Sequence, residues 1–100
     1  MKLEIVKKPV MTEFVIIDGT EFVLSHLLAS ISEIMETEEN DKYGEYSLRD
    51  YELSYHDTMD KLVEMGYVKT YTGPRQAHCY CLANEKGLAE LRDAIYELCD

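Results

Sequence analysis

The spacing of hydrophobic and polar positions changes several times along the 100 residues. Residues 3–17 read LEIVKKPVMTEFVII, which is rich in Val and Ile and carries a proline in the middle. Val and Ile favour strands, and proline interrupts strand pairing. This stretch predicts two short strands, or one strand and an extended arm, bent near Lys8 and Pro9.

A helical period follows the turn DGT at residues 18–20. The apolar positions that recur every three or four residues are Leu24, Leu27, Leu28, Ile31, Ile34 and Met35. This spacing predicts an amphipathic helix over residues 21–37, with Asp18 or Thr20 as its cap. The apolar stripe is wide enough for a core or for a contact between two copies.

The next part of the chain begins with an acidic stretch, ETEENDKYGEY, which predicts a solvated loop. Beyond it, Ser47 is a candidate helix cap, and Asp50, as the third helical residue, can complete a capping box with it. Residues 47–65 keep one apolar face, which fits either a single helix or two helices that meet near Leu53 and Ser54. Gly66 stands in the usual position of a residue that ends a helix.

The last third combines a hairpin with a helix. The runs YVKTYT and AHCYCLA are strand-like and are joined by GPRQ, a tight turn. Asn84 is the predicted cap of a final helix whose apolar stripe contains Leu88, Leu91, Ile95 and Leu98. The order of elements predicts a single α+β domain over residues 1–100.

The net charge of −10 changes what this domain can bind. A DNA-binding protein normally clusters Lys and Arg to neutralise phosphates, whereas this chain has 20 acids and 10 bases. The acids concentrate between Glu36 and Asp60, and the balance reverses between Lys61 and Ala83. A weakly basic hairpin therefore follows a negative middle segment.

Three segments of the second half carry a resemblance to known proteins: a helix end, a hairpin and the start of the last helix. DKLVEMGYV at residues 60–68 resembles DRLVEKGLV, and NEKGLAEL at residues 84–91 resembles TEKGRALL, in the MarR-like and PadR-like regulator families. The resemblance covers roughly residues 47–98 and includes the hairpin with Arg75 near its tip. It implies a winged helix-turn-helix fold, with a β-arm over residues 1–18, a winged-helix core over residues 19–98, and terminal helices through which two copies form a homodimer.

In these families the helix before the hairpin reads the major groove of double-stranded DNA, and the hairpin is the wing. The resemblance therefore implies contacts from helix 54–65 and wing 67–82. The contact residues would be Ser54, His56, Thr58, Lys61, Lys69, Arg75, Gln76 and His78. Asp57 stands where these families have an arginine, and His56 where they have a serine. The leading hypothesis is a small transcriptional regulator that binds an operator.

The acidic surface supports a second hypothesis, in which a winged-helix interaction module binds a basic protein. Proteins of phages and mobile elements work in this way, as inhibitors or as mimics of nucleic acid. The residues that would carry this interaction are Tyr43, Asp57, Asp60 and Glu64. The charge favours this hypothesis, and the wing-like hairpin favours the regulator.

Neither hypothesis includes catalysis or a cofactor. No Ser–His–Asp or Cys–His arrangement and no glycine-rich phosphate loop stands in the sequence. The acids around Gly44 lack the spacing of a calcium loop, and His78, Cys79, Cys81 and Cys99 lack the paired spacing of a structural zinc site. We therefore expect no enzyme, no metal and no cofactor.

The apolar runs and the cysteines indicate the cellular compartment in which we expect the protein. No run reaches the roughly 18–20 apolar residues that span a membrane. MKLEIVKK lacks the apolar region of a secretory signal. We expect a cytoplasmic protein, in the host cytoplasm if it is viral, with reduced thiols and with Cys79 and Cys81 buried on one face of a strand.

Overall fold

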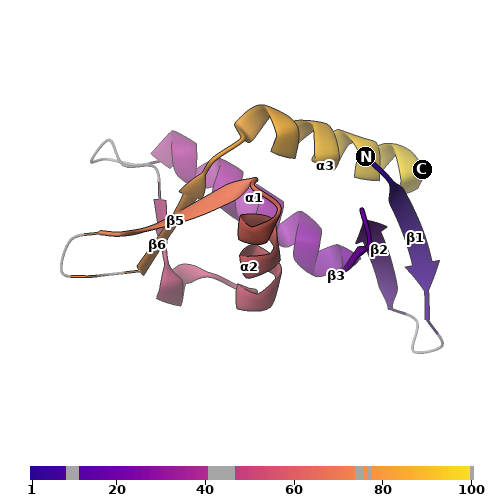
Figure 1. Ribbon diagram of the computed structural model, residues 1–100, viewed down its shortest axis with the longest axis horizontal. Coiled ribbons are helices and arrows are strands. Elements are labelled where there is room, and N and C mark those ends of the chain that lie inside the picture. Colours follow the sequence, from indigo (N-terminus) through magenta and orange to yellow (C-terminus); the bar gives the residue numbers. More distant parts are fainter. Residues whose placement is uncertain (9–11, 41–46, 74–75, 77, 100) are drawn as a thin grey trace.

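The computed structural model describes residues 1–8, 12–40, 47–73, 76 and 78–99. These residues form a mixed α+β fold with three α-helices and two small antiparallel sheets (Figure 1). The elements are β1 (Leu3–Lys7), β2 (Glu13–Ile17), β3 (Thr20–Val23), α1 (Leu24–Asn40), β4 (Ser47–Arg49), the 3-10 turn η1 (Asp50–Glu52), α2 (His56–Glu64), β5 (Val68–Thr72), β6 (His78–Leu82) and α3 (Glu85–Cys99). The predicted site residues Tyr43 and Arg75 lie outside the described residues.

The first sheet is a meander in the order β1-β2-β3. The two strands predicted over residues 3–17 are confirmed, but the prediction that a helix begins at residue 21 was wrong, because residues 20–23 form β3. Asp18 and Gly19 both have positive φ, 48° and 89°, between the paired residues Ile17 and Thr20. Asp-Gly with two positive φ values is a preferred hairpin turn, so DGT closes a hairpin instead of capping a helix.

Helix α1 begins at Leu24 and extends to Asn40, beyond the predicted end at residue 37. Its predicted stripe is confirmed, since Leu27, Ile31 and Ile34 are buried. It contacts β2 and β3 of the first sheet as well as β4 and β6 of the second sheet. The helix therefore joins the two sheets through one core.

The second sheet has the order β4-β6-β5. The hairpin β5–β6 was predicted correctly, but the prediction of helix over residues 47–55 was wrong. Residues 47–49 form β4, in which Leu48 lies opposite Tyr80, and residues 50–52 form η1. The backbone N–H of Arg49 donates to the Glu52 carboxylate at 2.9 Å, which closes the turn that separates β4 from α2.

Two helix boundaries follow the local signals in the sequence. Gly66 has φ of 87°, its N–H donates to the Val63 carbonyl at 3.0 Å, and the N–H of Tyr67 donates to the Leu62 carbonyl at 3.1 Å. This is the helix end that glycine favours. At α3, the Asn84 side chain accepts the N–H of Gly87 at 2.9 Å, so the predicted cap is confirmed.

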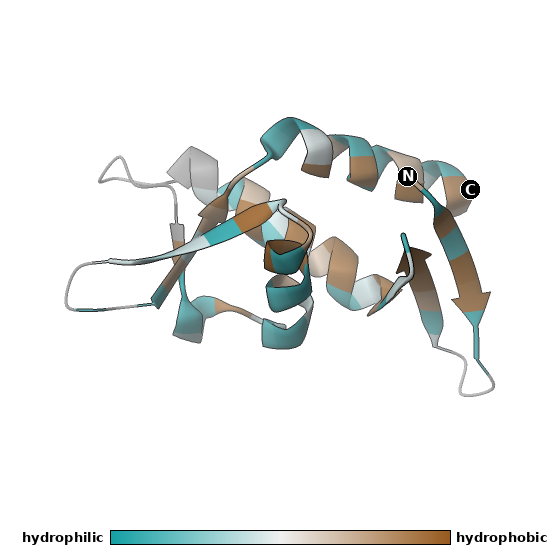
Figure 2. Cartoon of the chain, viewed as in Figure 1, coloured by the Kyte–Doolittle hydropathy of each residue, from teal (hydrophilic) through white to brown (hydrophobic). Residues whose placement is uncertain are grey.

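One hydrophobic core fills the space between the helices and both sheets, and apolar residues face inward along most elements (Figure 2). The stripes of α1 and α3 are part of this core, through Leu27 and Ile31 on α1 and Leu88 and Leu91 on α3. These stripes were the predicted contact between two copies. Because they are buried within one chain, the homodimer prediction loses the surface on which it was based.

In the described part of the chain, none of the helices combines the length and the apolar character needed to cross a bilayer.

Candidate nucleic-acid interface

Helix α2 and the β5–β6 hairpin form the surface on which the predicted contact residues lie. Strand pairing places Leu48, Tyr80 and Thr70 on one face of the second sheet, and Val68 and Leu82 lie on that same face. Tyr80 from this face donates its hydroxyl to the Asp60 carboxylate of α2 at 2.9 Å. Helix α2 therefore lies against the face that carries Tyr80, where the helix and the hairpin can meet one ligand together.

The bond between Tyr80 and Asp60 is the main polar link across this surface. Tyr80 is buried, with 3% of its surface exposed. Burial, followed by the bond to Asp60, raises the pKa of the Tyr80 phenol to about 12. The hydroxyl thus stays protonated and holds the Asp60 side chain in one direction.

The residues before α2 are held against α1. The Glu33 carboxylate accepts the hydroxyl of Ser54 at 2.7 Å and its backbone N–H at 3.2 Å. One residue later, the Tyr55 ring stacks on His26, with ring centroids 3.9 Å apart. Both contacts position the start of α2, and they occupy Ser54, which was predicted to contact DNA.

Thr58 and Lys61 also differ from their predicted roles. Thr58 is 6% exposed, so its side chain lies in the interior and not on the solvent-facing side of α2, from which it was predicted to contact DNA. The Lys61 ammonium donates to the backbone carbonyl of Glu21 at 2.8 Å and lies 5.5 Å from the centroid of the Phe22 ring. Lys61 is therefore bound to β3 and to the residues around it.

His56 is exposed at the start of α2, where it was predicted to contact DNA. Its Nε2 atom lies 3.0 Å from the Asp50 carboxylate of η1. A phosphate at this position would also approach the acidic Asp50. Each predicted contact residue between positions 54 and 61 is therefore buried or already engaged by another group of the chain.

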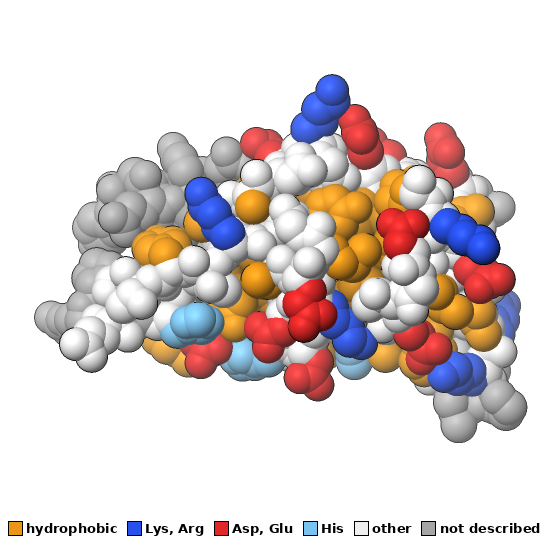
Figure 3. Space-filling view, in the orientation of Figure 1, with side chains coloured by type: hydrophobic (Ala, Val, Ile, Leu, Met, Phe, Trp, Pro, Cys, Tyr) orange, Lys and Arg blue, Asp and Glu red, His pale blue; other side chains and the backbone are white. Residues whose placement is uncertain are grey.

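Acidic side chains occupy the solvent-facing side of α2. Asp57, Asp60 and Glu64 are all exposed, and their spacing of three and four residues places them on one side of the helix. We call these three residues the acidic α2 face. Figure 3 shows acidic side chains gathered over the position of α2.

The wing residues divide between the two faces of the second sheet. Lys69, Gln76 and His78 are exposed. His78 lies on the Tyr80 side, where the two rings meet edge to face at 5.0 Å between centroids. Lys69 alternates to the opposite side, where it pairs with Cys81. The strand alternation therefore directs the Lys69 charge away from the acidic α2 face and from α2.

The cysteines confirm part of the prediction made for them. Cys79 is buried, whereas Cys81 is half-buried. Burial raises the pKa of the Cys81 thiol, and Lys69 opposes that shift. His78 and Cys79 point to opposite faces, Cys99 lies at the end of α3, and the described residues contain no group of three ligands suited to a metal ion.

Several residues that determine this surface were missed from the sequence. Glu33, Asp50 and Glu21 provide the partners of Ser54, His56 and Lys61. Glu33 and Glu21 lie far from their partners along the chain, so no local sequence motif indicates these contacts. Asp50 was interpreted as a helix residue, and only the turn of η1 brings it to His56.

No family model, no curated protein and no solved structure matches the chain. Its fold family and its function must therefore be inferred from its own geometry.

Proposed function

We propose that the chain is a winged-helix interaction module whose acidic α2 face binds a basic surface of another protein. The order β4-β6-β5, with α2 directly before β5, supports a winged-helix arrangement in which the β5–β6 hairpin is the wing. In that arrangement, α2 is the helix that a DNA reader would place in the major groove. The chemistry of α2 then decides which ligand fits.

The observation that carries the proposal is the exposure of Asp57, Asp60 and Glu64 on the side of α2 available to a ligand. Duplex DNA presents a negative charge about every 1.7 Å along its axis, so three carboxylates in the groove would oppose binding. The one lysine of α2, Lys61, is bound to the Glu21 carbonyl. A partner rich in Lys or Arg would instead find complementary charge.

The geometry also favours recognition over simple solvation of these acids. The Tyr80 hydroxyl fixes one carboxylate oxygen of Asp60, so this side chain has less freedom to lose when a partner binds. The exposed His78 ring packs edge to face with the buried Tyr80 ring on the same face of the sheet. An oriented carboxylate suits the guanidinium of an arginine of a partner protein.

The test uses a neutralised variant, Asp57→Asn/Asp60→Asn/Glu64→Gln, and a control with the same change of charge on α3, Glu85→Gln/Asp93→Asn/Glu97→Gln. Each protein is immobilised and used to capture proteins from nuclease-treated lysate of its source, and the bound species are quantified at increasing salt. We expect one basic protein to be retained by the wild type and the control. The neutralised variant should bind it roughly tenfold less tightly or worse.

The same proteins are passed over heparin and over random duplex DNA at about 50 mM salt, where even nonspecific DNA binding is strong. We expect no retention of the wild type. Retention of the wild type on duplex DNA, with partial release by Lys69→Ala, would overturn the proposal. Equal capture by the neutralised variant and the control would also overturn it.

A DNA-binding regulator is the second candidate, and the exposed wing supports it. Lys69, Gln76 and His78 extend from the hairpin in positions from which they could contact phosphates. If this function holds, Lys69→Ala should weaken binding to all DNA sequences about equally and should reduce the salt dependence by about one phosphate contact. The DNA experiment above therefore separates the two candidates.

A further inference from the structure

The chain has three histidines, and each of them makes a contact at or beside α2: His26, His56 and His78. Two of them border the acidic α2 face, and His26 stacks on the residue that precedes the helix. Histidine is the side chain whose charge ordinarily changes between about pH 5 and 8. A change of pH within this range therefore changes the charge around α2.

His56 is the first residue of α2 and stands among carboxylates. Its Nε2 atom lies 3.0 Å from the Asp50 carboxylate of η1, and both side chains are about half exposed. Asp57 follows His56 directly, and Asp60 lies about one helical turn further along the same side of α2. A proton on His56 therefore places a positive charge among three carboxylates.

His78 approaches the same carboxylates from the hairpin. Its ring packs edge to face with Tyr80, with 5.0 Å between the ring centroids, and the Tyr80 hydroxyl donates to Asp60 at 2.9 Å. Asp50 is close enough to this hydroxyl for its charge to contribute to the raised pKa of Tyr80. Figure 3 shows histidine side chains next to acidic ones on this part of the surface. We call Asp50, His56, Asp60, His78 and Tyr80 the histidine cluster.

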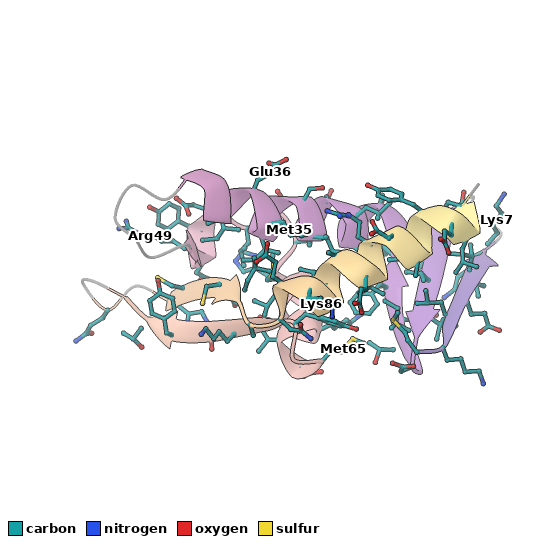
Figure 4. The ribbon with its side chains drawn as sticks, turned by 90° about the horizontal axis from the view of Figure 1, so that it is seen from above. Lys7, Met35, Glu36, Arg49, Met65 and Lys86 are labelled. Atoms are coloured by element: carbon teal, nitrogen blue, oxygen red, sulfur yellow. The ribbon has the colours of Figure 1, made fainter. Side chains whose placement is uncertain are left out.

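The basic side chains of the neighbouring elements are directed away from the histidine cluster. Arg49 and Lys69 alternate to the opposite face of the second sheet, where each lies opposite a cysteine of β6. Figure 4 shows Arg49 at one end of the molecule. Lys61 of α2 is bound to the Glu21 carbonyl of β3. Within the cluster, only the two histidines can carry a positive charge.

We propose that His56 and His78 regulate the acidic α2 face, so that it binds its basic partner at neutral pH and releases it as the pH falls toward about 5.5. This inference rests on the function proposed for that face. Above the range in which histidine titrates, four carboxylates act on the partner: Asp50, Asp57, Asp60 and Glu64. Below it, the two protonated histidines oppose them at short range. The attraction for Lys and Arg of the partner then decreases, because exposed charges act over about 10 Å at 0.1 M salt.

The contact between His56 and Asp50 adds a second effect in the same direction. A hydrogen bond between two charged groups is stronger than one between neutral groups, so a protonated His56 holds the Asp50 carboxylate more firmly. An arginine of the partner must then compete with His56 for that carboxylate. Both effects weaken binding of the partner as the pH falls.

The test titrates a poly-arginine peptide into the protein at about pH 7.5 and 5.5, in about 0.1 M salt, and follows the amide resonances of α2 by NMR. We expect the wild type to bind the peptide roughly threefold to tenfold less tightly at the lower pH. His56→Gln/His78→Gln should reduce this difference to less than about twofold. His26→Gln is the matched control and should keep the difference, because His26 stacks on the Tyr55 ring and not on a carboxylate.

Equal affinity of the wild type at the two pH values would overturn the proposal, as would a double variant that keeps the full difference. The neutralised variant defined above separates this failure from a failure of the proposed function. If the wild type binds the peptide no more tightly than the neutralised variant at the higher pH, the acidic α2 face is not the binding surface and both proposals fail. Thermal unfolding of every variant at both pH values confirms that the protein is folded in each titration.

Discussion

The two sheets of this molecule are built in opposite ways. The first, β1-β2-β3, comes from one continuous segment, its β2 and β3 are joined by the Asp18-Gly19 turn, and β1 pairs with β2 alone among the described residues. The second, β4-β6-β5, recruits β4 from before α2 and is held to that helix by the bond between Tyr80 and Asp60. A sheet made of local hairpins pairs its strands through residues that are close in sequence. A sheet made of distant strands pairs them only when other elements bring those strands together.

This difference also gives the two sheets different surroundings. The acidic α2 face combines carboxylates with a hydroxyl that orients one of them, and it suits a charged partner. On the first sheet, the backbone groups of Leu3, Ile5 and Lys7 in β1 point away from β2. The three experiments below measure how far the two regions depend on each other, beginning with the largest expected effect.

Phe22→Ala should have the largest effect, because Phe22 is 1% exposed and lies where β3 meets Lys61 of α2. Replacing a buried phenylalanine with alanine costs about 3–5 kcal/mol of the free energy of unfolding. If one core joins both sheets, urea unfolding should remain a single transition at a lower midpoint, with coincident far-UV circular dichroism and tyrosine fluorescence. Glu21→Gln, which weakens only an exposed ion pair, is the control and should cost less than about 1 kcal/mol. Two separate transitions would show that the sheets fold independently.

Tyr80→Phe should have an intermediate effect, confined to the second sheet. Loss of the bond to Asp60 should cost about 1 kcal/mol. An unfolded tyrosine ionises near pH 10, whereas the pKa of Tyr80 in the folded chain is about 12. Between these values the unfolded chain releases a proton that the folded chain keeps, so the free energy of unfolding falls as pH rises from 10 to 12.

Urea unfolding at pH 8 and at pH 11 measures this difference. The decrease in the free energy of unfolding between the two pH values should be smaller in Tyr80→Phe than in the wild type. Tyr51→Phe provides the control, because Tyr51 is exposed and its removal should leave the decrease almost unchanged. Equal decreases in the wild type and in Tyr80→Phe would contradict the assignment of the raised pKa to Tyr80.

His56→Gln should have the smallest effect, below about 0.5 kcal/mol, because the contact between His56 and Asp50 is exposed on both sides. Thermal unfolding at neutral pH measures it. A larger loss would show that this contact helps to hold η1 against α2, and the second sheet would then depend on surface contacts more than its core indicates.

The sequence predicted the elements whose signals are local. Gly66 and Asn84 were assigned correctly because a positive φ at a helix end and an amide cap need only neighbouring residues. The hairpin β5–β6 was also recognised from its two strand-like runs. Residues 18–20 show that even a local signal can be misassigned, since Asp-Gly closes a hairpin at a place where a helix cap was expected.

The elements and contacts that the sequence did not predict depend on residues far apart along the chain. Residues 47–49 become a strand because β6 lies beside them, although their apolar spacing also fits a helix. The surroundings of the candidate site depend on distant contacts in the same way: Thr58 was placed outward by comparison with a motif, whereas its side chain is buried in the structure. The Glu33 carboxylate accepts a hydrogen bond from Ser54, and the Asp50 carboxylate pairs with His56. Neither contact has a sequence pattern of its own.

The position of β6 between β4 and β5 has a consequence for the order of folding during synthesis. When the ribosome has released residues 1–23, the strands of the first sheet are all present and can pair. Strand β4 emerges much earlier than its partner β6, so it must wait, unpaired, until α2 and the hairpin have followed. Because chains fold from the N-terminus as they emerge, the nascent protein should expose the open edge of β1 before the second sheet exists.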